Sequence, residues 1–422
     1  MRSKSILIIS LTFLLSIPAF GQKNIYSTYS RYGIGELVKQ GFGSNIGYGS
    51  ISSGLRVDDV INYSNPASYT AQDTNSFIFD LGISANTAMQ RSSDAKINRT
   101  TAGFDHVAIG FPVFRWWKSS IGVVPLSHVG YHVKNTTAST DLDQIVNEYE
   151  GKGGVRQFYI GNGFSIGDHL SIGINYFYLF GSNNYRSASY LPQDPYSGQF
   201  QKEIVNTLSG SRFQLGLQYH WNIFSDYTMT AGASYDLQAN LNVERDEKFF
   251  SFYQFADSEG VLRQDTIDQV NASSSYTTQY PNGYRAGFTL QNPKLIVGAD
   301  FKYQNWSDVN EFDNLNDSYS MQAGFEYTPD RQALRNYFKR VNYRLGGYYK
   351  QSYLTINNQD LKDYGITFGL GIPLKYNKTK FNVALQLGRR GTTDQNLIEE
   401  NYAIINFNIT FYDFWFIQQK YQ

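Results

Sequence analysis

The sequence lacks several features that would point to common protein classes. It has no cysteine in 422 residues, so disulfides, thiol chemistry and thiolate metal sites are excluded. Its 36 basic and 36 acidic residues give no net charge, which argues against a nucleic-acid partner and against a polybasic membrane-surface protein. Mean hydropathy is −0.41, so hydropathy alone would not indicate a membrane protein.

The first 21 residues have the features of a secretory signal peptide. Arg2 and Lys4 provide a positive start, residues 6–17 are apolar, and Ala19 and Gly21 are the small residues that precede cleavage before Gln22. The apolar run is too short to span a membrane as a helix. No cysteine follows it, so a lipoprotein anchor is excluded. We therefore expect an exported protein.

What the chain has in abundance is aromatic residues and glycine. Aromatic side chains make up 16% of the residues, with 34 Tyr and 30 Phe, and there are 37 Gly. This balance favours strands over helices. It is also typical of a transmembrane β-barrel, in which only every second residue faces lipid and aromatic residues gather at both interfaces.

Hydrophobic residues alternate with small or polar residues from residue 73 to the end. Phe77, Phe79 and Leu81 share one face of the first segment, for example, whereas Asp80 and Gly82 share the other. Such segments of about ten residues match a tilted membrane strand. We count about fourteen of them and predict an all-β fold, a closed antiparallel transmembrane barrel over residues 73–422.

The connections between these segments alternate in length. Tight turns are expected near residues 116–119, 167–168, 222–226 and 291–294, and long polar loops over residues 90–103, 134–154, 181–209 and 238–281. Short periplasmic turns and long extracellular loops are the usual asymmetry of barrels in the outer membrane of Gram-negative bacteria. The pattern therefore predicts that membrane as the location of the protein.

Residues 22–72 have no such alternation and are predicted to form a plug, or hatch, inside the barrel. A barrel of about fourteen strands has a lumen too wide for side chains alone to fill. The stretch 29–71 is rich in Gly, Ser and Asn but carries six aromatic residues to bury. Glycines on the inward faces, such as Gly346 and Gly369, would leave room for a plug, or would mark bulges.

The end of this stretch resembles the hatch of the FadL/TodX family of outer-membrane transporters. The matching features are small residues at 47–49, an acidic element at 57–59 and a Tyr before Asn-Pro-Ala at 63–67. The resemblance implies monomeric fourteen-stranded barrels that admit long-chain fatty acids or aromatic hydrocarbons by diffusion. The hatch or gate residues that it implies are Asp58, Asp59, Asn65, Pro66 and Ala67.

Two stretches depart from that family pattern. The run at 29–37 is similar to a subgroup of FadL-like barrels whose substrates we cannot name. At the other end, Phe411 is followed by eleven residues instead of closing the chain, so either 414–416 provides the terminal aromatic signal or the tail packs in the periplasm. Some FadL-like barrels are accessory subunits of protein-export systems, which offers a second function.

Three sets of side chains are candidates for a site. Inward-facing charges would either pair with one another or with the hatch, or latch the plug shut through partners such as Arg56, Asp58 or Asp59; these charges are Asp80, Asp300, Lys302, Glu326 and Arg344. A cluster in the longest loop would either receive an apolar ligand or extend strands above the membrane: Phe249, Phe250, Phe252, Tyr253 and Phe255. Histidines, among them His106, fall on inward faces, and we expect them to line the lumen.

These observations leave three functions, in descending order of support. The first is an outer-membrane channel for small hydrophobic molecules, and the second is an accessory or scaffold barrel of a secretion or outer-membrane assembly complex. The third, an outer-membrane enzyme, lacks any catalytic constellation in the sequence. Expected partners are outer-membrane lipid and lipopolysaccharide, a hydrophobic small-molecule ligand and envelope proteins. We expect no cofactor, metal or nucleic acid.

Overall fold

The computed structural model describes residues 26–93, 95–137, 144–192, 198–224, 226–256, 262–309, 315–374 and 378–414, with the side chains of 252–268 left out. The predicted signal peptide (1–21) and the tail after Phe414 lie outside these ranges. No helix in the described part of the chain is long and apolar enough to cross a membrane.

The fold is a closed antiparallel barrel. Its strand segments are β2 (Ser76–Arg91), β3 (Lys96–Phe114), β4 (Trp117–Thr137), β5 (Ile145–Ile166), β6 (Leu170–Tyr190), β7 (Gln199–Phe224), β8 (Tyr227–Asp236), β9 (Ala239–Ala256), β10 (Leu262–Tyr280), β11 (Gly283–Gln291), β12 (Leu295–Gln304), β13 (Ser318–Tyr327), β14 (Asn342–Ile356), β15 (Gln359–Pro373), β16 (Lys380–Arg390) and β17 (Glu399–Phe414). Because β8 leads into β9, and β10 into β11, these segments make fourteen strands. Pairing of β17 with β2 closes the ring, and the predicted fold is confirmed.

Alternation decides which way each side chain faces. On β6, Ile172 and Ile174 are exposed on the outer face, whereas Ser171 and Asn175 are buried inside. The apolar outer band ends in aromatic rings, and its upper limit is marked on neighbouring strands by the stacked rings of Tyr235, Tyr284 and Tyr303. This arrangement is the expected one for a barrel whose outer band faces lipid.

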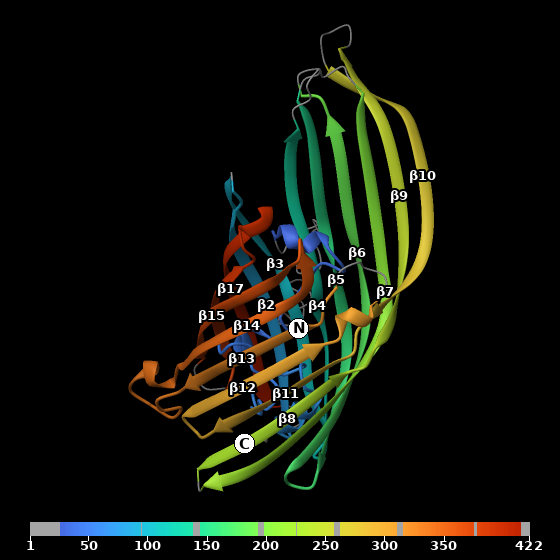
Figure 1. Cartoon of the computed structure of the whole chain (residues 1–422). Helices are drawn as coiled ribbons and strands as arrows, with labels where there is room; N and C mark the ends of the chain where they lie inside the picture. Colours follow the sequence, from blue (N-terminus) through green and yellow to red (C-terminus); the bar gives the residue numbers. More distant parts are fainter. Residues whose placement is uncertain are drawn as a thin grey trace, which may run out of the picture.

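Above that band one side of the barrel rises much higher than the other. The strands β4, β5, β6, β7, β9 and β10 continue upward as a curved sheet, which we call the wall, while β11 to β17 stop lower (Figure 1). β7 has 26 residues, whereas β12 has 10, about the number needed to cross the bilayer. Much of 134–154, 181–209 and 238–281, which the sequence predicted as loops, is therefore strand.

Two strands of the wall have an edge that no neighbouring barrel strand covers. β3 pairs with β4 only from Val107–Val123 down to Phe114–Trp117, so above this point β5 is the only barrel strand beside β4 among the described residues. β10 pairs with β9 along its length, and β12 takes the other side only from Gly283 onward. These are the two free edges of the wall.

Residues 26–75, the inner segment, lie inside the barrel (blue in Figure 1). The segment contains η1 (Thr28–Arg31), β1 (Glu36–Leu37), α2 (Gly43–Ile46) and η2 (Pro66–Ala71). Its aromatic rings form the core, with Phe42, Tyr63 and Tyr69 almost completely buried against the barrel wall. The glycine-rich composition therefore belongs to a packed segment and not to an unfolded tail.

Candidate functional site

The first part of the inner segment, residues 26–38, runs along the free edge of β4, and we call it the edge segment. Glu36 and Leu37 pair with His128 and Ser127 as a short antiparallel ladder. The Ser27 amide donates to the Gly130 carbonyl (2.8 Å) and the Val38 amide to the Leu126 carbonyl (3.0 Å). The edge segment thus takes the place beside β4 that β3 leaves empty.

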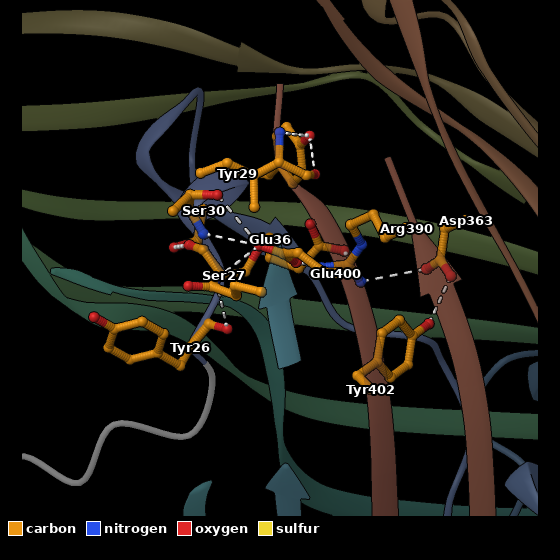
Figure 2. Close-up of polar contacts among 12 residues, drawn as sticks. Tyr26, Ser27, Tyr29, Ser30, Glu36, Asp363, Arg390, Glu400 and Tyr402 are labelled. Atoms are coloured by element: carbon orange, nitrogen blue, oxygen red, sulfur yellow. Dashed lines mark hydrogen bonds and ion pairs between the residues drawn. The ribbon is translucent and has the colours of Figure 1, made fainter. Parts of the chain in front are cut away.

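A buried ionic group, the anchor cluster, holds the edge segment to β15, β16 and β17 (Figure 2). Arg390 lies 3.0 Å from Glu36, 3.3 Å from Asp363 and 3.6 Å from Glu400. Glu400 also accepts hydrogen bonds from the Ser27 hydroxyl (2.8 Å) and from the Thr28 amide (3.0 Å). All four charged side chains are less than 10% exposed.

The cluster contains one guanidinium and three carboxylates, so it depends on further cations. Lys350 lies 3.7 Å from Glu36 and Lys39 lies 3.9 Å from Asp363. Burial lowers the pKa of Lys39 to about 7 despite the opposing attraction of Asp363. Its ammonium nitrogen lies 3.1 Å from the centre of the Tyr348 ring, a cation–π contact. Sequence analysis singled out none of these residues.

The predicted hatch acids are bound at the opposite, lower end. Asp59 pairs with Lys380 at 2.6 Å, and both side chains are nearly buried. Asp58 shares the partly exposed Lys378 with Asp73 at 2.6 and 2.7 Å. Their partners are thus the lysines at the start of β16 and just before it, and not any of the inward charges that the sequence suggested.

The Asn-Pro-Ala stretch has a specific structural role. The Asn65 side-chain oxygen accepts from the Ala67 amide and caps η2, while its amide donates to the carbonyls of Ser53 (2.8 Å) and Leu217 (3.2 Å). Pro66 and Ala67 approach the barrel where Gly173 and Gly216 face inward, and a side chain at either glycine would collide with them. The inward glycines here make room for the inner segment.

Comparison with known proteins gives a family and a fold. A family model described as BamG matches residues 2–422. The chain belongs to the BamG family. No curated protein matches it.

Among solved structures, the P. putida toluene transporter TodX is similar, with 15% identity, a TM-score of 0.63 and coverage of 89% of this chain and 99% of that chain. A Pseudomonas aeruginosa FadL homologue has 11% identity, a TM-score of 0.60 and the same coverage. The Ralstonia pickettii toluene transporter TbuX has 14% identity, a TM-score of 0.58 and coverage of 88% and 98%. At these identities the likeness shows a shared fold.

The inward charges of this BamG-family chain have different partners. Asp300 accepts the amides of Ser52 (2.7 Å) and Ser53 (2.9 Å), so it does hold the inner segment. Glu326 pairs with Arg344 at 2.7 Å between neighbouring strands. Among the described residues, Lys302 has no carboxylate within ion-pair distance; it lines a recess beside Arg285.

Asp80 bonds to His106 at 2.6 Å, and the other ring nitrogen of His106 bonds to Asp105 at 2.7 Å. The Phe42 ring stacks on the imidazole at 3.9 Å between centres. With both nitrogens occupied by carboxylates and an exposure of 1%, this histidine has no nitrogen left to activate a nucleophile.

The aromatic cluster predicted in the longest loop lies on β9 instead. Successive residues of a strand face opposite sides, so Phe249 and Phe250 point to different faces of the wall. Phe249 is 40% exposed on the inner face, beneath the Lys202 ammonium. The side chains of Phe252, Tyr253 and Phe255 lie outside the described residues. The described pair does not form one apolar pocket.

A cavity of about 100 Å³ lies directly behind the gap between β3 and β4. The inner segment forms one side of it, with Leu37 and Phe42, and Val124 and Pro125 of β4 form another. Asn86 and Asn406 also line it and are more than 90% buried, and Asn86 Oδ1 and Asn406 Nδ2 have no hydrogen-bond partner within the described part of the chain. Because charged residues of the anchor cluster line it as well, the cavity has both apolar and polar walls.

Proposed function

We propose that this protein is an outer-membrane channel for small hydrophobic molecules, gated by its edge segment. The observation that carries the proposal is the parting of β3 and β4: among the described residues, only the edge segment lies across the opening, and the cavity is immediately behind it. The similar folds of proteins named as toluene transporters support it. The inner segment acts as the hatch.

The size of the cavity selects among hydrophobic ligands. An engineered apolar cavity of about 150 Å³ holds one benzene, whereas sites for drug-sized ligands occupy about 300 Å³ or more. At about 100 Å³, the closed state accommodates at most a single ring after a small shift of the side chains around it. We therefore propose single-ring aromatic compounds rather than long-chain fatty acids as the ligands.

The test is to pin the edge segment to β4. Leu37 and Ser127 are register partners, so L37C with S127C places two sulfurs within disulfide reach in a chain that has no other cysteine. In cells whose only copy of the gene encodes this variant, oxidation should reduce the rate of uptake of a labelled single-ring aromatic compound at least tenfold. Reduction should restore it.

A matched control places the same cross-link in the wall. Asn242 and Thr277 are register partners on β9 and β10, and both are exposed. N242C with T277C should leave uptake unchanged under both conditions. If the oxidised L37C/S127C protein takes up the compound as fast as the reduced one, the edge segment is not the gate.

A second function, an accessory barrel of an envelope protein complex, is favoured by the wall. A channel does not need strands of up to 26 residues with a free edge above the membrane, whereas a docking subunit does. Purification of the native protein in mild detergent, followed by mass spectrometry of proteins and small molecules together, separates the two. Stoichiometric protein partners support the accessory role, and their absence argues against it.

A further inference from the structure

The free edge of β10 is open over residues 269–275. All seven residues are exposed, with Val270 at 54%. Their backbone pairs with β9 on one side, and no other backbone hydrogen bond among the described residues reaches them. In an antiparallel ladder every second residue turns its N–H and C=O away from the neighbour. A row of unused donors and acceptors therefore faces outward.

Lower down, the same edge is covered by the chain itself. The Asn305 amide donates to the Asn282 carbonyl (3.1 Å), and Trp306 packs on Tyr280 with ring centres 5.9 Å apart. Trp306 is 1% exposed, so this cover is tightly packed. Among the described residues, this cover does not reach 269–275. The open stretch is thus a local feature and not a general property of the wall.

The open stretch also lacks the sequence features that keep sheet edges from pairing with other strands. Natural edge strands are blunted by charge, proline or bulges. Residues 269–275, with the sequence QVNASSS, contain no charged residue and no proline. The register irregularity in the pairing with β9 lies above this stretch, between Thr266 and Asp268. Nothing within the stretch itself prevents another strand from adding.

The neighbouring side chains indicate what kind of strand would fit. On the outer face of β9, Glu244, Asp246 and Lys248 lie beside this edge, and Ser273 donates a hydrogen bond to Asp246 (2.7 Å). On the inner face the edge offers small or apolar groups at Val270, Ala272 and Ser274. An added strand matches both sides if its outer face carries basic residues near Glu244 and Asp246 and an acidic or polar residue near Lys248, and if its inner face carries small or apolar residues.

We propose that residues 269–275 of β10 bind an extended segment of another envelope protein by β-strand addition, in the antiparallel direction. A second copy of this chain fits less well, because two barrels inserted in the same direction present parallel β10 strands, and parallel pairing is slightly less stable per residue. The edge of β4 provides a precedent within this chain, because there the extended edge segment pairs antiparallel with β4 in place of a barrel strand. This inference rests on the accessory role and gives it a docking site.

The test uses the full-length protein in its native membrane, with the photo-cross-linker p-benzoylphenylalanine placed at 270, 272 or 274 in turn. Strand addition predicts cross-links to one segment of one partner, at positions that step back by two as the probe moves forward by two. Cross-links scattered over a partner surface, or to a second copy of this chain, would overturn the proposal. If partners co-purify but their cross-links show no such register, the docking site is wrong and the accessory role stands.

Two proline variants provide the internal control. Consecutive N–H groups of a strand point to opposite sides, so one of Ser273→Pro and Ser274→Pro removes a donor that faces the open side, and the other removes a ladder bond to β9. We expect one variant to keep the heat stability of the barrel and to reduce cross-linking from position 270 at least tenfold. If that stable variant cross-links as well as the unsubstituted chain, the inference fails.

Discussion

The two free edges of the wall differ in what covers them. The edge of β4 is covered by the protein's own edge segment, whose position is fixed by a buried ionic cluster. The edge of β10 at 269–275 is uncovered and carries only uncharged residues. One edge is thus closed within the chain, next to the lumen, and the other faces outward. The proposed gate and the proposed docking site therefore lie at different edges, and each can be disturbed without the other.

The largest effect is expected from the arginine of the anchor cluster. Arg390→Met leaves Glu36, Asp363 and Glu400 buried without their shared counter-ion, which typically costs about 3–5 kcal/mol. Amide hydrogen exchange in the edge segment should become at least a hundredfold faster, while exchange in β10 stays as before.

The neighbouring arginine is the matched control. Arg389 lies on the outer face, is 47% exposed and pairs with Glu399 at 2.6 Å. Glu399 is only 10% exposed, but among the described residues neither Arg389 nor Glu399 bonds to the edge segment, so Arg389→Met should leave exchange there nearly unchanged. Equal effects of the two substitutions would show that the cluster does not hold the edge segment.

A smaller effect is expected at the cap of η2. Asn65→Ala removes the cap of η2 and one of two donors to the Ser53 carbonyl, which keeps the Gln218 amide at 2.9 Å, at a cost of about 0.5–2 kcal/mol. Protease sensitivity of the inner segment should rise accordingly. Asn336 makes the same cap on the exposed helix η4 (Tyr337–Arg340), so Asn336→Ala should cost about 1 kcal/mol or less and leave the inner segment resistant.

The smallest expected effect is a difference in hydrogen exchange between the two edges of the unsubstituted protein. Along 127–130 of β4 the strand pairs with β5 on one side and, on the other, with Glu36 and Leu37 and through the Gly130 amide with the Ser30 hydroxyl (3.0 Å), whereas along 269–275 of β10 only the β9 side is paired among the described residues. Hydrogen exchange should therefore show continuous protection in β4 and protection of every second residue in β10. Continuous protection in β10 of the purified chain would mean that its edge is already covered.

The alternation of side chains was enough to predict the barrel and its strand number, but it failed for the wall. The period-two signal requires one apolar face, and above the lipid band both faces of β9 are polar: Glu244 and Asp246 lie outside, Arg245 and Glu247 inside. A polar strand then has the composition of a loop. For the same reason Phe249 and Phe250 were taken for one loop cluster.

The site could be predicted only in part. Asn65, Pro66 and Ala67 were found because they form a local motif whose cap and close approach involve adjacent residues. The partners of Asp58 and Asp59 were not found, since a plug can dock on any inward face and no local pattern connects it to Lys378 or Lys380. The anchor cluster was missed because its members are far apart in the sequence.

That separation has a consequence for how the chain folds. The hydrogen bond from Ser27 to Glu400 joins residues 373 positions apart, and the β16 and β17 strands that hold the edge segment are synthesised after the other described strands. The edge segment therefore cannot make its contacts with the anchor cluster until these strands have formed and β17 has paired with β2. A chain shortened before β16 should accumulate with its N-terminal region open to chaperones and proteases.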